Sequence, residues 1–225
     1  MKIGIIGGGG VGQTLGAGLI AAGHSVTIGI RAATPDALAK PRAQAKPLAD
    51  WITATGGKVA TMAQTASGAD LIINATLGES SIAALTLAGA ANLADKVLID
   101  VGNPLDFSQG MPPALTAALS GHTRLAEQIQ AAFPTARVVK AFNTMGASIM
   151  THPGSVAGAH DLLIAGNDPA AKDSVIAIAK GFGWQNFVDL GDLKAACAME
   201  AQVLLWARVM EATGSFVHNI HIARG

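Results

Sequence analysis

The sequence predicts an α/β fold built on a doubly wound parallel sheet, with a small C-terminal α/β-plus-helix extension. A short β-branched run, Ile3–Ile6, leads directly into a glycine-rich turn and then a helical segment. Two further buried strands, Asp70–Thr76 and Lys96–Val101, alternate with helical segments, as a parallel sheet requires. We expect residues 1–142 to form a dinucleotide-binding domain and residues 143–225 an extension continuous with it.

The glycine-rich turn fits the pattern G-x-G-x-x-G at Gly7, Gly9 and Gly12. The first glycine allows a sharp turn, the second leaves room for a pyrophosphate, and the third lets helix and strand pack closely. The helix predicted over Val11–Ala22 would offer the free N–H groups of its first turn to the phosphates. A glycine-rich hinge without a ligand is the alternative, but the strand–turn–helix order favours a Rossmann-type nucleotide site.

The end of the second strand, Ser25–Ile30, indicates which dinucleotide binds. NAD enzymes usually carry Asp or Glu there to bind the ribose 2′-hydroxyl. Here Ile30 is followed by Arg31, and no acidic residue occurs before Asp36. A guanidinium suits a 2′-phosphate, so we predict NADP(H) rather than NAD(H), with Arg31 on the 2′-phosphate. The alternative is a solvated surface arginine.

The remaining elements continue the alternation of strands and helices. Glycine, proline and capping residues mark their ends; Asp168 before Pro169, for example, is a typical helix start. Helices are predicted over Pro35–Lys40, Leu48–Thr55, Met62–Ala66, Glu79–Leu87, Arg124–Phe133, Pro169–Phe182 and Leu193–Thr213. Strands are predicted over Lys58–Ala60, Arg137–Phe142, Asp161–Ala165 and Gln185–Leu190. The long connection Leu105–His122 is either a lid over the site or an ordinary surface excursion.

Composition narrows the class of protein. The 225 residues are 50% hydrophobic and 13% charged, and fifteen basic residues balance fifteen acidic ones, so neither nucleic acid nor a membrane surface is expected as a partner. The single cysteine, Cys197, fits a reducing compartment. No signal peptide precedes the first strand, and the weakly polar stretch 81–94 is too short to span a bilayer. We therefore expect a cytoplasmic protein.

Several motifs together resemble a known family. They include the glycine turn, Gly29-Ile30-Arg31 and Asp100-Val101-Gly102-Asn103-Pro104, and more specifically Lys140-Ala141-Phe142-Asn143-Thr144 and Asp189-Leu190-Gly191-Asp192. Over nearly its whole length, the chain resembles the NADP oxidoreductases that depend on the deazaflavin coenzyme F420. It also resembles the cytosolic reductase domain of the six-transmembrane epithelial antigen metalloreductases.

The resemblance implies an extended NADPH lying across the strand ends. The pyrophosphate would be held by the glycine turn, through Gly7, Gly9, Gly10, Val11 and Gly12. Ile30 and Arg31 would face the 2′-phosphate, and Thr76 and Leu77 would line the middle of the cofactor. The residues near the nicotinamide would be Asn103, Pro104, Ala141 and Asn143. Two positions depart from the deazaflavin enzymes. Ile30 stands where a serine is usual, and Asn143 stands where they place a histidine. The Phe-Asn form occurs in the metalloreductase domains, so an ordinary flavin remains a second candidate acceptor.

The sequence offers no obvious acid–base residue, and we assign no catalytic side chain beyond Asn143 as a candidate. Hydride transfer to a flavin-type ring needs little proton transfer by the protein, whereas a carbonyl or imine reductase needs a proton source. Tyrosine is absent. Lys140 lies two residues before the end of its predicted strand and could point into the site or away from it; we expect the more common case, a solvent-facing lysine, and assign it no role. The favoured function is NADPH-dependent hydride exchange with a deazaflavin or flavin. The alternatives are reduction of a small carbonyl or imine, and a non-catalytic NADP-binding sensor.

Two further expectations concern the C-terminal part. His218 and His221 are spaced to share a helix face, but without a neighbouring cysteine we expect no metal site. The helix predicted over Leu193–Thr213 carries Trp206 and several aliphatic residues, which favour core packing or a homodimer interface over a cofactor contact.

Overall fold

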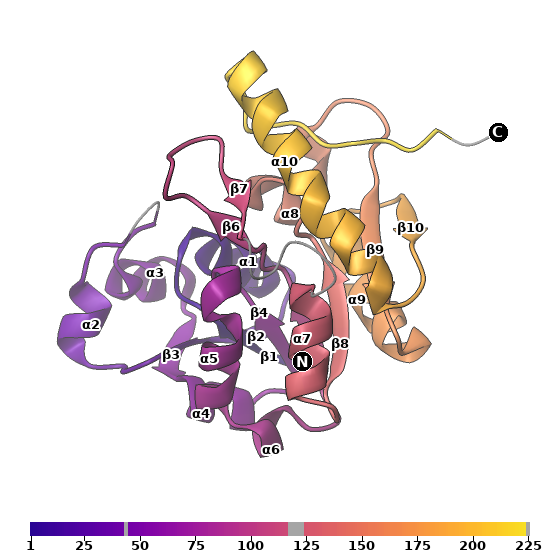
Figure 1. The fold of residues 1–225 in the computed structure, drawn as a ribbon. Helices are drawn as coiled ribbons and strands as arrows, with labels where there is room; N and C mark the ends of the chain where they lie inside the picture. Colours follow the sequence, from indigo (N-terminus) through magenta and orange to yellow (C-terminus); the bar gives the residue numbers. More distant parts are fainter. Residues whose placement is uncertain (43–44, 117–123, 224–225) are drawn as a thin grey trace.

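The computed structural model describes residues 1–42, 45–116 and 124–223 and confirms the α/β class. Eight strands form one sheet in the order β10-β9-β8-β5-β4-β1-β2-β3, and helices cover both faces (Figure 1). The strands of this sheet are β1 (Lys2–Ile6), β2 (Ser25–Ile30), β3 (Lys58–Thr61), β4 (Leu71–Asn74), β5 (Val97–Asp100), β8 (Arg137–Ala141), β9 (Leu162–Gly166) and β10 (Phe187–Asp189).

The described helices confirm most of the expected segments. They are α1 (Gly10–Ala21), α2 (Pro35–Ala39), α3 (Leu48–Thr55), α4 (Met62–Ser67), α5 (Gly78–Ala88), α6 (Ala90–Leu93), α7 (Leu125–Ala132), α8 (Ala147–Thr151), α9 (Pro169–Gly181) and α10 (Ala196–Thr213), with the short 3-10 turns η2 (Pro153–Ser155) and η3 (Leu193–Ala195). The sequence did not predict α6 and α8, because both are short and neither begins with a capping side chain that would mark its start.

The sheet is parallel except at one junction. β9 runs antiparallel to β8, and β10 is parallel to β9. The chain leaves β8 at its carboxyl end and forms α8 and η2. It then enters β9 from this same end of the sheet, so β9 runs antiparallel to β8. The expected doubly wound parallel sheet is thus confirmed for six strands, and two strands of the C-terminal part extend the same sheet in the opposite direction.

The sheet separates the hydrophobic core into two layers. One face of the sheet carries residues such as Ile5, Ile73 and Ile99, which pack with α1, α3 and α9. The other face carries Ile72, Leu98 and others, which pack with α4, α5 and α7. Because side chains alternate along each strand, the register fixes which residues meet at each level of the sheet.

Two features stand outside the sheet. A hairpin of β6 (Leu105–Asp106) and β7 (Ala114–Leu115) forms part of the connection expected at 105–122, whose residues 117–122 lie outside the described part. Helix α10 crosses near α7 and extends beyond the sheet (Figure 1). Within the described ranges, no helix is both long and apolar enough to span a membrane.

Candidate functional site

The glycine turn between β1 and α1 has the geometry of a phosphate cradle. Gly7 has a φ of +117°, and a Cβ there would lie 2.5 Å from the Ala75 carbonyl oxygen; a Cβ at Gly12 would overlap the Gly7 carbonyl oxygen. Among the residues that the structure describes, none has an atom within 4 Å of where a Cβ at Gly9 would lie, and Gly9 has an ordinary φ of −80°. Packing therefore explains Gly7 and Gly12, whereas Gly9 leaves space on the open side of the turn.

The start of α1 is open to an anion. Gly9 is the N-cap, no side chain caps the helix, and its first turn, which includes Gly10 and Val11, carries no acidic residue. The unpaired N–H groups and the positive end of the helix dipole suit a pyrophosphate. The residues present at this turn therefore fit a dinucleotide cofactor.

Gln13 supports the turn from inside. Its buried amide donates to the carbonyl oxygens of Gly8 (3.1 Å) and Lys46 (2.8 Å). Trp51 Nε1 in turn donates to the Gln13 carbonyl oxygen at 2.9 Å, and the Trp51 ring occupies the space that a Cβ at Gly16 would need. The loop before α3 thereby holds the glycine turn in place.

The end of β2 presents basic side chains beside this turn. Ile30 is buried and Arg31 is exposed at the first position after the strand. Arg42, which no sequence motif indicated, lies close to Gly8: its Nη1 is 3.5 Å from where a Gly8 Cβ would stand, and its Nη2 donates to the Ala37 carbonyl oxygen at 3.2 Å. Its position twelve residues beyond the end of β2 gave no sequence signal.

Polar side chains at the ends of β4 and β5 form a connected network. Thr76 Oγ1 donates to Asn74 Oδ1 at 2.7 Å and lies 3.0 Å from Ser81 Oγ. The buried Asn74 amide donates to Ser81 Oγ at 3.0 Å and to Asp100 Oδ1 at 2.8 Å. Thr76 is therefore held rigidly at the strand end, while the neighbouring Leu77 side chain is 66% exposed.

The end of β8 turns back toward the end of β5. Phe142 has a φ of +63°, an unusual value for a non-glycine residue and a feature often found at functional sites. Behind it, Asn143 Nδ2 donates to Asn103 Oδ1 (2.9 Å) and to the Met199 carbonyl oxygen of α10 (3.0 Å), and Asn103 Nδ2 donates to the Asn143 carbonyl oxygen (2.7 Å). Asn143 Oδ1 is buried without a hydrogen-bond partner among the described residues.

Lys140 is not a solvent-facing lysine, so that prediction was wrong. Its side chain is fully buried, and Nζ contacts Asp100 Oδ2 (2.8 Å), Glu200 Oε1 (2.9 Å) and the Gly102 carbonyl oxygen (2.6 Å). Burial lowers the pKa of Lys140, but the Asp100 and Glu200 carboxylates outweigh this effect and hold its pKa above the ordinary value. The lysine therefore stays charged, and all three of its N–H donors are used.

The other residues predicted to bind the cofactor lie at the same end of the sheet, where the parallel strands have their carboxyl ends, and they differ in exposure. Pro104 and Ala141 are buried, and Ala141 is 0% exposed, so neither its backbone nor its side chain is open to solvent. Gly78 N donates to the Asn103 carbonyl oxygen at 3.1 Å and brings the β4–α5 turn against this segment. The roles of these residues in cofactor binding remain predictions. His218 instead stacks on Trp206, with ring centroids 5.3 Å apart, and His221 Nδ1 is 3.0 Å from Asp161 Oδ2.

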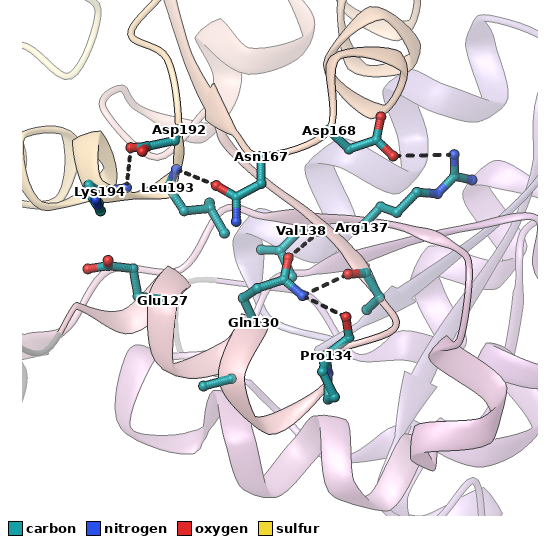
Figure 2. Close-up of a pocket in the computed structure, with 12 residues that line it drawn as sticks. Glu127, Gln130, Pro134, Arg137, Val138, Asn167, Asp168, Asp192, Leu193 and Lys194 are labelled. Atoms are coloured by element: carbon teal, nitrogen blue, oxygen red, sulfur yellow. Dashed lines mark hydrogen bonds and ion pairs between the residues drawn. The ribbon is translucent and has the colours of Figure 1, made fainter.

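A separate pocket of about 540 Å³ lies where β8 begins and β9 ends, at the amino-terminal end of the parallel strands. Figure 2 shows the side chains that line it. It is lined by the start of β8, the end of β9 and parts of α7 and η3, including Arg137, Asp168 and Lys194. Gln130 and the 3.8 Å pair of Arg137 with Asp168 mainly tie these elements together. Because parallel α/β sheets bind nucleotides at the carboxyl ends of their strands, this pocket is not the cofactor site.

Comparison with known proteins agrees with this geometry. Residues 2–104 match the family model "NADP oxidoreductase coenzyme F420-dependent". The crystal structure of a candidate F420-dependent NADP-reductase from Arthrobacter sp. FB24 is 46% identical, with a TM-score of 0.92 and full coverage of both chains. Metalloreductase STEAP3 of Rattus norvegicus is 29% identical over 202 residues, or 89% of this chain and 36% of that protein, so the chain spans about a third of this curated relative.

A more distant likeness shows the fold alone. The imine reductase of Myxococcus stipitatus, solved with NADP⁺, is 17% identical with a TM-score of 0.62, covering 94% of this chain and 63% of that one. The full-length match at 46% identity and the family match across the glycine turn and the ends of β4 and β5 identify an NADP-dependent oxidoreductase. The chain belongs to the family of coenzyme F420-dependent NADP oxidoreductases.

Proposed function

We propose that this protein transfers hydride between NADP(H) and a planar ring acceptor, either the deazaflavin coenzyme F420 or a flavin. The observation that carries the proposal is the chemistry of the described strand ends. They offer amides, hydroxyls and backbone groups, while the one lysine among them, Lys140, is buried and fully paired. Bound NADPH supplies the hydride, and the acceptor ring takes it together with one proton from solvent.

The side chains of this chain would bind and orient the cofactor. The N–H groups at the start of α1 would hold the pyrophosphate, and Arg31 with Arg42 would face the 2′-phosphate. Thr76 would contact the middle of the cofactor, because its hydroxyl is fixed by Asn74. Asn143 Oδ1, a buried acceptor in need of a donor, would accept from the carboxamide of the nicotinamide.

A ring acceptor is favoured over a carbonyl or imine for a specific reason. Reducing a carbonyl requires a proton donor beside the developing oxyanion. Lys140 has no free N–H to offer, because two carboxylates and a carbonyl oxygen occupy its donors. Positioning of two rings and exclusion of water is then the main contribution of the protein.

The proposal is tested by turnover with a panel of acceptors. NADPH oxidation would be followed with purified protein and either coenzyme F420, free flavin, or a set of small carbonyls and imines. We expect oxidation with a ring acceptor and none with carbonyls or imines. Turnover with a carbonyl or imine would favour the reductase alternative, and NADPH binding without any oxidation would favour an NADP-binding sensor.

We also propose that two copies associate through α10 and the segment after it. Leu205 of α10 is 56% exposed, and Phe216 and Val217 in the segment after it are 60% and 47% exposed, whereas Met199 and Val203 in the first half of α10 are buried. A second copy would remove these apolar side chains from water. Light scattering at micromolar concentration should give the mass of a dimer, and Leu205→Glu together with Phe216→Glu should yield a monomer. A monomeric wild-type protein would overturn this proposal.

A further inference from the structure

A buried charge cluster lies directly beneath the predicted nicotinamide end of the site. The register aligns Asn74 with Asp100 and Asp100 with Lys140, so these three side chains stand side by side on one face of β4, β5 and β8. Glu200 reaches the same row from α10, which covers this face with α7. Asp100, Lys140 and Glu200 are each at most 3% exposed in their side chains.

The contacts give the cluster a formal charge of minus one. Asp100 accepts from Lys140, Asn74 and the Gly102 N–H, and Glu200 accepts from Lys140 and from the N–H groups of Leu125 and Ala126. Every one of these partners is a donor, which is the pattern of two ionised carboxylates around one ammonium. The start of α7 offsets part of the excess negative charge.

Gly102 joins the cluster directly to the segment that is predicted to lie near the nicotinamide. Gly102 donates its N–H to Asp100 at 3.1 Å and accepts from Lys140 at 2.6 Å, and it immediately precedes Asn103. Asn143, the other residue predicted to lie near the nicotinamide, is bonded to α10 one residue before Glu200. In a sheet of this topology the nicotinamide half crosses the ends of β4 and β5, because the glycine turn and Arg31 hold the other half over β1 and β2.

We propose that the Asp100–Lys140–Glu200 cluster favours the oxidised cofactor over the reduced one, and so drives hydride from NADPH toward the acceptor. The inference rests on the proposed function, because it requires the nicotinamide to bind at these strand ends. The oxidised nicotinamide ring carries a positive charge and the reduced ring carries none. A buried net negative charge nearby stabilises only the charged form, and low water content leaves this interaction weakly screened.

The test is the ratio of the dissociation constants of NADP⁺ and NADPH, measured by titration of the full chain. Glu200→Gln removes one negative charge and keeps an acceptor for the start of α7, while the neutral pair of Asp100 with Lys140 remains. We expect this ratio to rise by about three- to tenfold, through weaker binding of NADP⁺. Asp100→Asn removes the other carboxylate and should move the ratio in the same direction.

Glu211→Gln is the matched control, because it makes the same change on the exposed end of the same helix. An unchanged ratio in Glu200→Gln and Asp100→Asn, with NADPH still bound, would show that the cluster is only a structural clamp. If neither variant folds, the wild-type ratio decides: NADP⁺ bound at least as tightly as NADPH supports the proposal, and binding weaker by more than about tenfold overturns it. Wild-type protein that binds neither nucleotide would overturn the proposed function itself.

Discussion

Arg31 carries the prediction that the protein prefers NADP(H) to NAD(H). Arg31→Glu would replace a cation with an anion beside the 2′-phosphate, and we expect the dissociation constant of NADPH to rise on the order of a hundredfold. That of NADH, which has no 2′-phosphate, should change by less than about threefold. Fluorescence titration measures both constants, and Arg208→Glu on α10 is the control. Equal losses for the two nucleotides would contradict the assignment.

Gly9 is expected to matter for cofactor binding and not for the stability of the fold. A Cβ at Gly9 would contact no atom in the described part of the chain, so Gly9→Ala should change the unfolding free energy by less than about 1 kcal/mol. Because the methyl group would stand where the pyrophosphate approaches, we expect NADPH affinity to fall on the order of tenfold. Gly154→Ala, at another position where a Cβ meets nothing, should leave affinity unchanged. Retained affinity in Gly9→Ala would place the phosphates elsewhere.

At the scale of elements, the strand–turn–helix unit and the central strands could be predicted from sequence. β1, α1 and β2 follow local rules: β-branched runs, a glycine at each turn and a regular alternation. The charge cluster could not be predicted. It depends on the register of β5 with β8 and on Glu200, which α10 brings back from a hundred residues beyond Asp100. Lysine and glutamate are usually exposed, and only the tertiary contacts show otherwise.

The buried ion cluster should matter far more for stability than an exposed pair. Lys140→Met would leave Asp100 and Glu200 buried without their shared cation, and we expect a loss of about 3–5 kcal/mol in unfolding free energy. Lys172→Met makes the same change in the pair with Asp189, a carboxylate that is 53% exposed, and should cost about 1 kcal/mol or less. Urea denaturation compares the two variants. Similar losses would mean that burial of the cluster contributes little.

At the scale of the whole molecule, β9 and β10 join the sheet of the nucleotide-binding part. We propose that residues 1–142 and 143–225 unfold together, because Glu200 of α10 bonds directly to Leu125 of α7 and to Lys140 of β8. Thermal unfolding followed by circular dichroism and by tryptophan fluorescence should give coincident transitions, since Trp51 and Trp184 lie in different parts of the chain. Two separated transitions would indicate independent domains.

Isotope labelling follows the transferred hydride directly. NADPH deuterated at the transferred position, prepared as each stereoisomer, would be incubated with the protein and coenzyme F420, and the reduced deazaflavin analysed by mass spectrometry. Its acceptor atom is a carbon, so transferred deuterium is retained. We predict deuterium in the product from one stereoisomer and not from the other. Product without deuterium from both stereoisomers, or no product with F420 or with flavin, would contradict hydride transfer to a ring acceptor at this site.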